Sequence, residues 1–171
     1  SYSVSADIYH SFGRVQTNLL IEAYYTKLKH IFVVSPIGYD EEGNKILERR
    51  NGSGAKVKGI NLEGKIIPHR DVQIQLGISL QQNKYNRPQS WSDDPDTKKT
   101  REMLRSPNRY GYFTFFTSPF KKFGISASGT YTGSMYVPHM AGYIEKDKLE
   151  KSGDFFDANI KLNYDFTISG N

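Results

Sequence analysis

Strict alternation of side-chain type marks one ten-residue stretch, which reads Val72-Gln73-Ile74-Gln75-Leu76-Gly77-Ile78-Ser79-Leu80-Gln81. Every even-numbered position is aliphatic, and every odd-numbered position is polar or glycine. Successive side chains of an extended chain point to opposite faces, so a period of two requires a β-strand with one apolar and one polar face. Residues 155–167 repeat this pattern, with Phe156, Ala158, Ile160 and Leu162 on one side. An all-β fold is therefore predicted.

Seven segments carry strand signals, and their connections alternate in length. The strands are expected at Tyr2–Tyr9, Val15–Val34, Gly54–Ile67, Val72–Lys84, Arg109–Thr117, Phe123–Thr132 and Phe155–Thr167. Short connections (10–14, 68–71 and 118–122) alternate with long ones (35–53, 85–108 and 133–154). In an up-and-down meander, alternate connections fall at the same end of the sheet, as in membrane barrels with short turns and long outer loops. We predict an antiparallel up-and-down meander of about seven strands, part of a large transmembrane β-barrel.

The aromatic content agrees with a membrane barrel. The chain has twelve Tyr, ten Phe and one Trp, and rings collect near both ends of the predicted strands, as the aromatic girdles of membrane barrels do. Those near the short turns are Phe12, Phe116, Phe120, Phe123, Tyr164 and Phe166, and those near the long loops are Phe32, Tyr85, Tyr110, Tyr131 and Phe155. No apolar run approaches the roughly 20 residues of a membrane helix. A short helix is predicted only in the second long loop, at Lys98–Leu104, with Pro107 beyond its end.

No catalytic, cofactor-binding or metal-binding residues can be assigned. There is no cysteine, and the four histidines (His10, His30, His69 and His139) have no metal-site spacing. The acidic run 93–96 lacks the glycine turn and later glutamate of a calcium-binding loop. The net charge of +5 is scattered rather than clustered, which argues against nucleic acid as a partner. We therefore expect no enzyme activity.

Residues 11–13 with 18–26, residues 51–64, residues 105–112 and residues 131–139 resemble four segments of TonB-dependent outer-membrane receptors. Residues 11–13 with 18–26 resemble a turn and strand of such barrels, and residues 51–64 resemble a strand start in which a glycine and a glutamate alternate on the lumen face. Residues 105–112 resemble another strand entry. Residues 131–139 are similar to a late loop entry in the siderophore, colicin and cobalamin receptor group, especially its Bacteroides-type members.

The resemblance implies uptake of a scarce nutrient across the outer membrane, with a ferric siderophore or a cobalamin-like ligand as the expected partner, outer-membrane lipid around the barrel, and coupling to TonB. The N-terminal plug, the TonB-contacting segment and the final strands have no counterpart in this sequence. We expect residues 1–171 to be a single piece of a longer receptor barrel. TonB contact is expected to lie outside it.

Alternatives remain open at this level. A soluble β-barrel that binds a small ligand would show the same alternation, with its apolar face pointing inward. A basic single-strand nucleic-acid binder is less favoured, because the cations share no face. Under the leading hypothesis, ligand contact falls on the long loops, where the candidates are Tyr39, Trp91, Tyr136 and His139. Seven strands also leave two unpaired edges, so the isolated chain is expected to self-associate through them.

Overall fold

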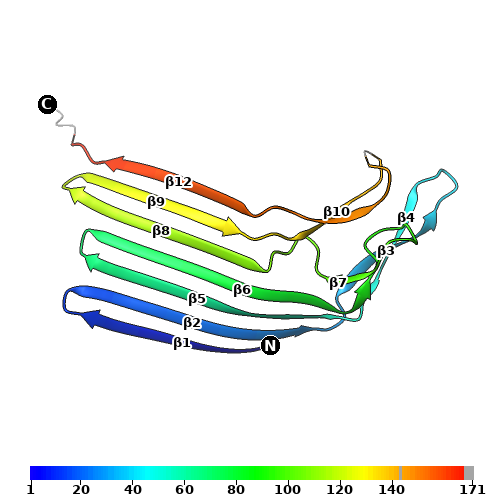
Figure 1. The fold of residues 1–171 in the computed structure, drawn as a ribbon, viewed down its shortest axis with the longest axis horizontal. Coiled ribbons are helices and arrows are strands. Elements are labelled where there is room, and N and C mark those ends of the chain that lie inside the picture. Colours follow the sequence, from blue (N-terminus) through cyan, green and yellow to red (C-terminus); the bar gives the residue numbers. More distant parts are fainter. Residues whose placement is uncertain (143, 168–171) are drawn as a thin grey trace.

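The computed structural model describes residues 1–142 and 144–167, without the side chains of residues 35, 36 and 45. Seven long antiparallel strands form one sheet in the order β1-β2-β5-β6-β8-β9-β12 (Figure 1). Their bounds are Tyr2–Phe12 (β1), Val15–Leu28 (β2), Ala55–His69 (β5), Val72–Gln89 (β6), Arg109–Phe120 (β8), Phe123–Thr132 (β9) and Phe155–Tyr164 (β12). Each long strand pairs with its neighbours in sequence order, which confirms the predicted meander.

Short turns and long loops lie at opposite ends of the sheet, as predicted (Figure 1). The long-loop end carries two extra hairpins and one short strand. The first hairpin joins β3 (Phe32–Tyr39) to β4 (Lys45–Asn51), and the second joins β10 (Tyr136–His139) to β11 (Lys148–Lys151). The short strand, β7 (Thr100–Glu102), pairs with β6. The long loops are therefore structured projections beyond the sheet.

Two sequence predictions at this end are wrong. The second strand does not run to Val34, because it ends at Leu28 and His30 takes a left-handed φ of 52° that separates β2 from the β3–β4 hairpin. The expected helix at Lys98–Leu104 is not formed, and β7 stands in its place. β6 extends past its last pair with β8, at Leu80 and Arg109, and its free edge accepts β7 instead. A helix this short has little stability of its own, so strand pairing prevails.

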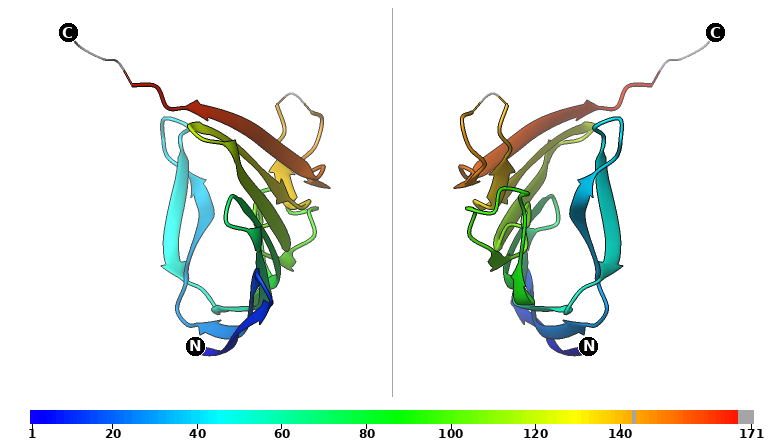
Figure 2. Two further views of the ribbon diagram at one scale, coloured as in Figure 1. Left: turned by 90° about the vertical axis from the view of Figure 1, so that its left-hand side faces the viewer. Right: turned by 90° about the vertical axis from the view of Figure 1, so that its right-hand side faces the viewer.

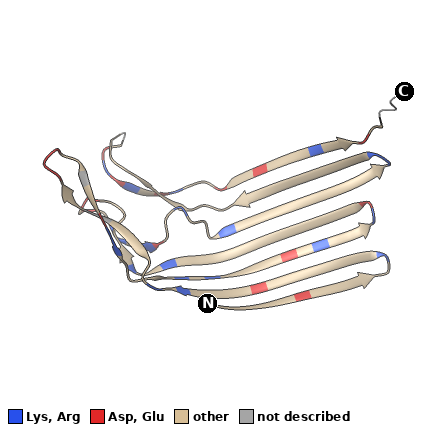
Figure 3. Ribbon diagram, turned by 180° about the vertical axis from the view of Figure 1, so that it is seen from behind, with Lys and Arg blue, Asp and Glu red and all other residues tan. Residues whose placement is uncertain are grey.

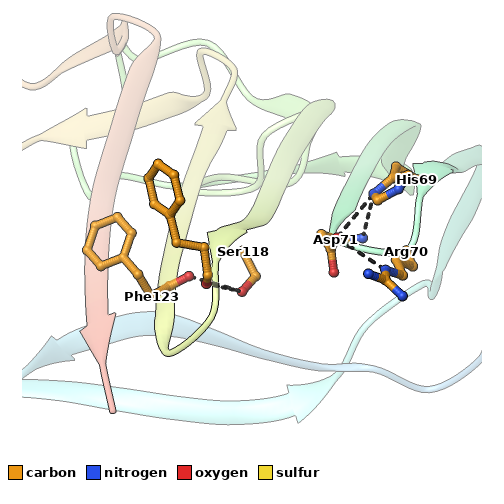
Figure 4. A network of polar contacts seen from close by, with 6 residues as sticks. His69, Arg70, Asp71, Ser118 and Phe123 are labelled. Carbon is orange, nitrogen blue, oxygen red and sulfur yellow. Dashed lines mark hydrogen bonds and ion pairs between the residues drawn. The ribbon is translucent and has the colours of Figure 1, made fainter. Parts of the chain in front are cut away.

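Each short connection is a two-residue turn between directly paired strands. Gly13 opens the first turn at φ 64°, a conformation that glycine adopts without strain. The second and third turns are joined by one bond, in which the Ser118 backbone N–H donates to the Asp71 carbonyl (2.9 Å). Within the third hairpin, the Ser118 hydroxyl donates to the Phe123 carbonyl (3.0 Å). His69 and Arg70 both lie against the Asp71 carboxylate, at 3.2 and 3.5 Å (Figure 4). These contacts hold the turn end together.

The sheet bends into an open arc, a single layer with no second layer packed on it (Figure 2). Its accessible surface is 12,985 Å², whereas a compact globular chain of this mass exposes about 8,500 Å². In the described part of the chain, Ala55 is the one apolar residue that is fully buried. The fold therefore has almost no core of its own, and its apolar side chains need cover from outside the sheet.

Both sheet edges are open. Within the described residues, β1 pairs only with β2, and β12 pairs only with β9. The two edge strands run in the same direction (Figure 1), as an odd number of antiparallel strands requires. Direct pairing of β1 with β12 would be parallel, so this meander cannot close on itself in an antiparallel barrel.

Candidate functional site

One face of the sheet carries a band of polar side chains that hydrogen-bond from strand to strand. Its centre is Glu63 on β5, whose carboxylate accepts from the Tyr112 hydroxyl (2.5 Å) and the Gln75 amide (2.8 Å). The Gln75 amide also donates to the Tyr112 hydroxyl, at 3.0 Å. The band thereby joins β5, β6 and β8. Because Glu63, Gly77 and Tyr112 are directly paired in register, they must share this face.

A glycine makes room for the Tyr112 ring. A Cβ at Gly77 would lie 2.1 Å from a ring carbon of Tyr112, so no other residue fits there without moving the ring. Tyr24 uses Gly59 in the same way: a Cβ at Gly59 would lie 2.6 Å from its hydroxyl, which donates to Gln81 across the strand at 3.1 Å. Glycines therefore allow long aromatic side chains to lie flat along the polar face and present hydroxyl groups.

A second carboxylate lies one step along the same face. Glu22 accepts from the Asn61 amide at 2.9 Å, and the Asn61 carbonyl accepts from the Ser79 hydroxyl at 2.7 Å. Together with the first cluster, these residues line a hollow of about 550 Å³ whose wall also includes Tyr110 and Thr132. Neutral donors satisfy both glutamates. The hollow is mixed in character: it has two carboxylates and several hydroxyl groups, and Leu20, Leu62 and Ile78 add apolar surface.

The exposure of the two faces is the reverse of that in a soluble protein. On β6, the aliphatic side chains Leu76, Ile78 and Leu80 are 56%, 53% and 49% exposed, whereas the intervening polar positions are half-buried and Gly77 is buried. Side chains crowd on the inner side of a curved sheet, so the polar face is the concave one. A soluble barrel would place its apolar face inward. The arrangement disfavours that alternative and matches a barrel with a wet interior and an apolar exterior.

The rings that were predicted to form aromatic girdles are divided between the two faces of the sheet. At the short-turn end, Phe12, Phe120, Phe123 and Tyr164 share the apolar face through their strand pairing. Near the long loops, the same registers put Tyr110, Tyr85 and Phe155 on the polar face, while Tyr131 lies on the apolar face. An outward girdle is therefore formed at the turn end, and most of the predicted loop-end rings face the interior.

The four predicted ligand-contact residues lie in three different loops at one end. Tyr39 ends β3 and is 68% exposed, at the edge of the first hairpin. The Trp91 indole N–H donates to the Lys98 carbonyl, which closes a small ring within the second loop (3.0 Å). Tyr136 and His139 both belong to β10; the Lys151 ammonium lies 5.7 Å from the Tyr136 ring, and the His139 imidazole lies 3.6 Å from Glu150. Only Tyr136 and His139 share an element.

The second and third loops form one unit. The buried Ser92 hydroxyl donates to the Asp147 carboxylate, whose other oxygen accepts from the Ala141 backbone N–H at 2.6 Å. The Arg105 backbone N–H donates to the Tyr136 carbonyl at 2.8 Å. The candidates Trp91, Tyr136 and His139 are therefore carried on linked loops. Sequence reasoning missed this link, because no local pattern relates Ser92 to Asp147.

Two loop carboxylates have lowered pKa values. A hydrogen bond from the Tyr131 hydroxyl (2.7 Å), followed by one from the Ser134 backbone N–H, lowers the pKa of Asp154. The adjacent Lys148 ammonium lowers the pKa of Glu150. Both groups are negatively charged at neutral pH. Asp154 joins the two ends of the third loop, and Glu150 contacts both strands of the β10–β11 hairpin.

No metal site is evident in the residues that the structure describes. Nowhere in that part do three His, Asp or Glu side chains come close enough to hold a metal ion. In the acidic run, Asp94 caps its own turn by accepting from the Asp96 backbone N–H (2.9 Å) and from Thr97. No helix among those residues has the length and apolar character to cross a bilayer.

Comparison with known proteins supports the fold. No family model matches the chain, and no curated protein matches it. Among solved structures, it is similar to the siderophore receptor PirA from Acinetobacter baumannii, with a TM-score of 0.51 and 13% sequence identity. The match covers 96% of this chain and 25% of that protein. At this identity the likeness concerns the fold, which resembles a quarter of a siderophore receptor.

Proposed function

We propose that this chain forms part of the barrel wall of an outer-membrane transporter of the TonB-dependent receptor type. The observation that carries the proposal is the reversed sheet, with a half-buried polar face and a broadly exposed aliphatic face. Such a sheet is stable where hydrocarbon covers one side and water or another domain fills the other. The likeness to a siderophore receptor supports the same class.

The transported nutrient would be scarce and bulky, such as a ferric siderophore or a cobalamin. It would enter at the long-loop end, where Tyr39, Trp91, Tyr136 and His139 offer rings and an imidazole for contact. The hydroxyl-lined hollow around Glu63 and Tyr112 would then line the interior below the loops. The plug and the TonB contact would belong to other parts of the receptor. The narrower likeness to Bacteroides-type members stays a prediction.

Sidedness in intact cells tests the class of protein. The chain has no cysteine, so single cysteines can report exposure to a membrane-impermeant maleimide in a full-length protein that carries no other cysteine. Tyr39→Cys in the first long loop should react in intact cells, whereas Arg70→Cys in a short turn should react only after the outer membrane is permeabilised. Equal labelling of both positions in intact cells, or recovery of the protein in the soluble fraction, would exclude the proposal.

Nutrient contact needs a separate test. Replacing Tyr39, Trp91, Tyr136 and His139 with alanine in the full-length protein should reduce growth on the limiting nutrient without changing the amount of assembled protein. A control with His10→Ala and His69→Ala, at the short-turn end, should grow normally. Unchanged growth of the loop variant would remove these residues from the contact surface.

A further inference from the structure

Three lysines face one another on the apolar side of the sheet, at its long-loop end. Lys27 on β2 pairs directly with Lys56 on β5, which pairs directly with Lys84 on β6. These three residues are called the basic row, and they correct the expectation from the sequence that the cations share no face. They share a face with Ala23, Ile60 and Leu80 two rungs below, because each lies an even number of residues farther along its strand. The basic row therefore tops the aliphatic surface, and Figure 3 shows Lys and Arg gathered at the loop-side ends of the central strands.

Such a row is unfavourable unless something negative offsets it, because like charges directly opposite in a sheet repel. One member has a protein partner: the Lys84 ammonium lies 2.8 Å from the Glu102 carboxylate on β7. Lys27 and Lys56 are exposed, and neither forms an ion pair within the described residues. The sheet thus holds two adjacent cations whose charge is balanced by no neighbouring carboxylate of the described chain.

A hollow of about 620 Å³ lies directly below the basic row. Its apolar floor includes Ile60 and Leu80, the Tyr25 ring lies beside them, and Lys58 and Arg109 stand at its margin. Lys58 pairs with Tyr25, and Arg109 pairs with Leu80, so both cations belong to the outer face. The surface combines an apolar lower part with a cationic upper part, as an amphiphile with an anionic head requires.

The height of the basic row matches a headgroup layer. On β2, the outward positions from Val15 to Tyr25 span ten residue steps, which correspond to about 25 Å along the membrane normal at about 3.3 Å a residue and a tilt of about 40°. This equals the apolar band of a membrane barrel. Lys27 lies two residues beyond Tyr25, about 5 Å higher. The ammonium groups therefore reach the level of lipid phosphates.

We propose that the basic row, with Lys58, binds the phosphate headgroup of an anionic lipid whose acyl chains lie on the aliphatic surface below. The inference rests on the proposed location in a membrane. It adds a specific lipid site to the outer wall, distinct from the interior that nutrients would cross. Glu102 sets the position of Lys84, and the exposed Lys27 and Lys56 ammonium groups contact the phosphate.

The test uses the full-length protein reconstituted into vesicles of phosphatidylcholine, with or without phosphatidylglycerol at one lipid in five. The measurement is lipid retained on the protein after extraction into a zwitterionic detergent, read by native mass spectrometry. The variant is Lys27→Gln/Lys56→Gln/Lys58→Gln. The matched control is Lys98→Gln/Lys99→Gln/Lys146→Gln, which removes the same charge from exposed loop positions outside the basic row.

Wild type and control should retain phosphatidylglycerol in preference to phosphatidylcholine. The preference of the variant should be at least tenfold smaller, because each lysine near an anionic surface strengthens binding by about fivefold. Equal preference in the variant and wild type, an equal loss in the control, or displacement of the lipid by millimolar inorganic phosphate would overturn the lipid assignment. Failure of wild type to insert into pure phosphatidylcholine would instead count against the membrane location itself.

Discussion

A lysine in place of Ile78 tests which face of the sheet meets lipid. Ile78 lies on the aliphatic face and pairs with Leu62 on β5, which in turn pairs with Ile21 on β2. Ile21 is six residue steps from Val15 and four from Tyr25 on β2, which puts this row within about 3 Å of the middle of the apolar band. The Ile78 side chain is 53% exposed in the sheet alone, so a lysine there meets little steric resistance and its cost comes from the surroundings.

The expected cost follows from that depth. A lysine on the lipid face at the bilayer middle destabilises a membrane barrel by about 2–4 kcal/mol, a factor of roughly 30 to 700 in the folding equilibrium. Leu80→Lys, two residues nearer the headgroups, should cost less. Thr130→Lys is the matched control. Thr130 is next to Tyr131, which is at the same level of the sheet as Ile78, but its side chain lies on the polar face, opposite Asp157. Its effect should stay within about 0.5 kcal/mol.

Guanidinium unfolding of the full-length protein in vesicles measures these differences. The informative result is a smaller loss of stability for Leu80→Lys than for Ile78→Lys. A bilayer produces this difference because the cost of a charge falls toward its surface, whereas a packed protein core does not. If Ile78→Lys is as stable as Thr130→Lys, the aliphatic face does not contact hydrocarbon. If Thr130→Lys is the damaging change, the two faces have been assigned in reverse.

Three further outcomes are expected. Gly54→Ala should destabilise the start of β5 by at least about 1–2 kcal/mol, because Gly54 has a φ of 84° and a Cβ there would lie 2.3 Å from the Leu28 carbonyl oxygen. The control is Gly64→Ala on β5, where a Cβ would meet open space. Equal unfolding midpoints for the two variants would refute the reasoning. Tyr112→Phe should cost about 1–2 kcal/mol by removing a hydrogen bond to the Glu63 carboxylate, whereas Tyr110→Phe, whose hydroxyl has no hydrogen-bond partner among the described residues, should be nearly neutral. Because folding lowers the pKa of Asp154 below its usual 3.8, the hydrogen bonds of its carboxylate stabilise the third loop above about pH 4 and are lost as the pH falls through the lowered pKa. Protection of the Ser134 amide from exchange should therefore fall below about pH 4 in wild type. An Asp154→Asn protein that kept the same pH dependence would contradict this assignment.

The strand pairing was predictable because two signals agree along the chain. Alternation indicates which residues share a face, and two-residue turns then leave a single register for each hairpin. Alternation alone does not say which face of β8 is apolar, since Tyr110-Gly111-Tyr112-Phe113 is aromatic on both faces. The pairing of Gly77 with Tyr112 resolves it. A glycine opposite an aromatic residue was the signal that could have identified the Glu63 cluster from the sequence.

The loop structure was not predictable, and the reason is physical. β7 forms because β6 offers a free edge, a condition created by where β8 begins and not by residues 100–102 themselves. The link between Ser92 and Asp147 joins positions 55 residues apart without any shared pattern. Alternation by itself describes two faces without saying which one is concave, and the apolar exterior followed instead from the sorting of short turns and long loops.

The direction of the edge strands limits how the sheet can be completed. β1 and β12 run the same way, so an antiparallel barrel that includes this meander needs an odd number of further strands between them, from the same chain or another. A second copy supplies seven more strands, again an odd number, but its edges pair antiparallel, β12 with β12 and β1 with β1, only if that copy is inverted across the membrane. Such inversion would put long loops at both ends and the basic rows at opposite surfaces. An odd number of further strands that continue the same meander avoids this conflict, which favours such strands over self-association as the way in which the sheet is completed.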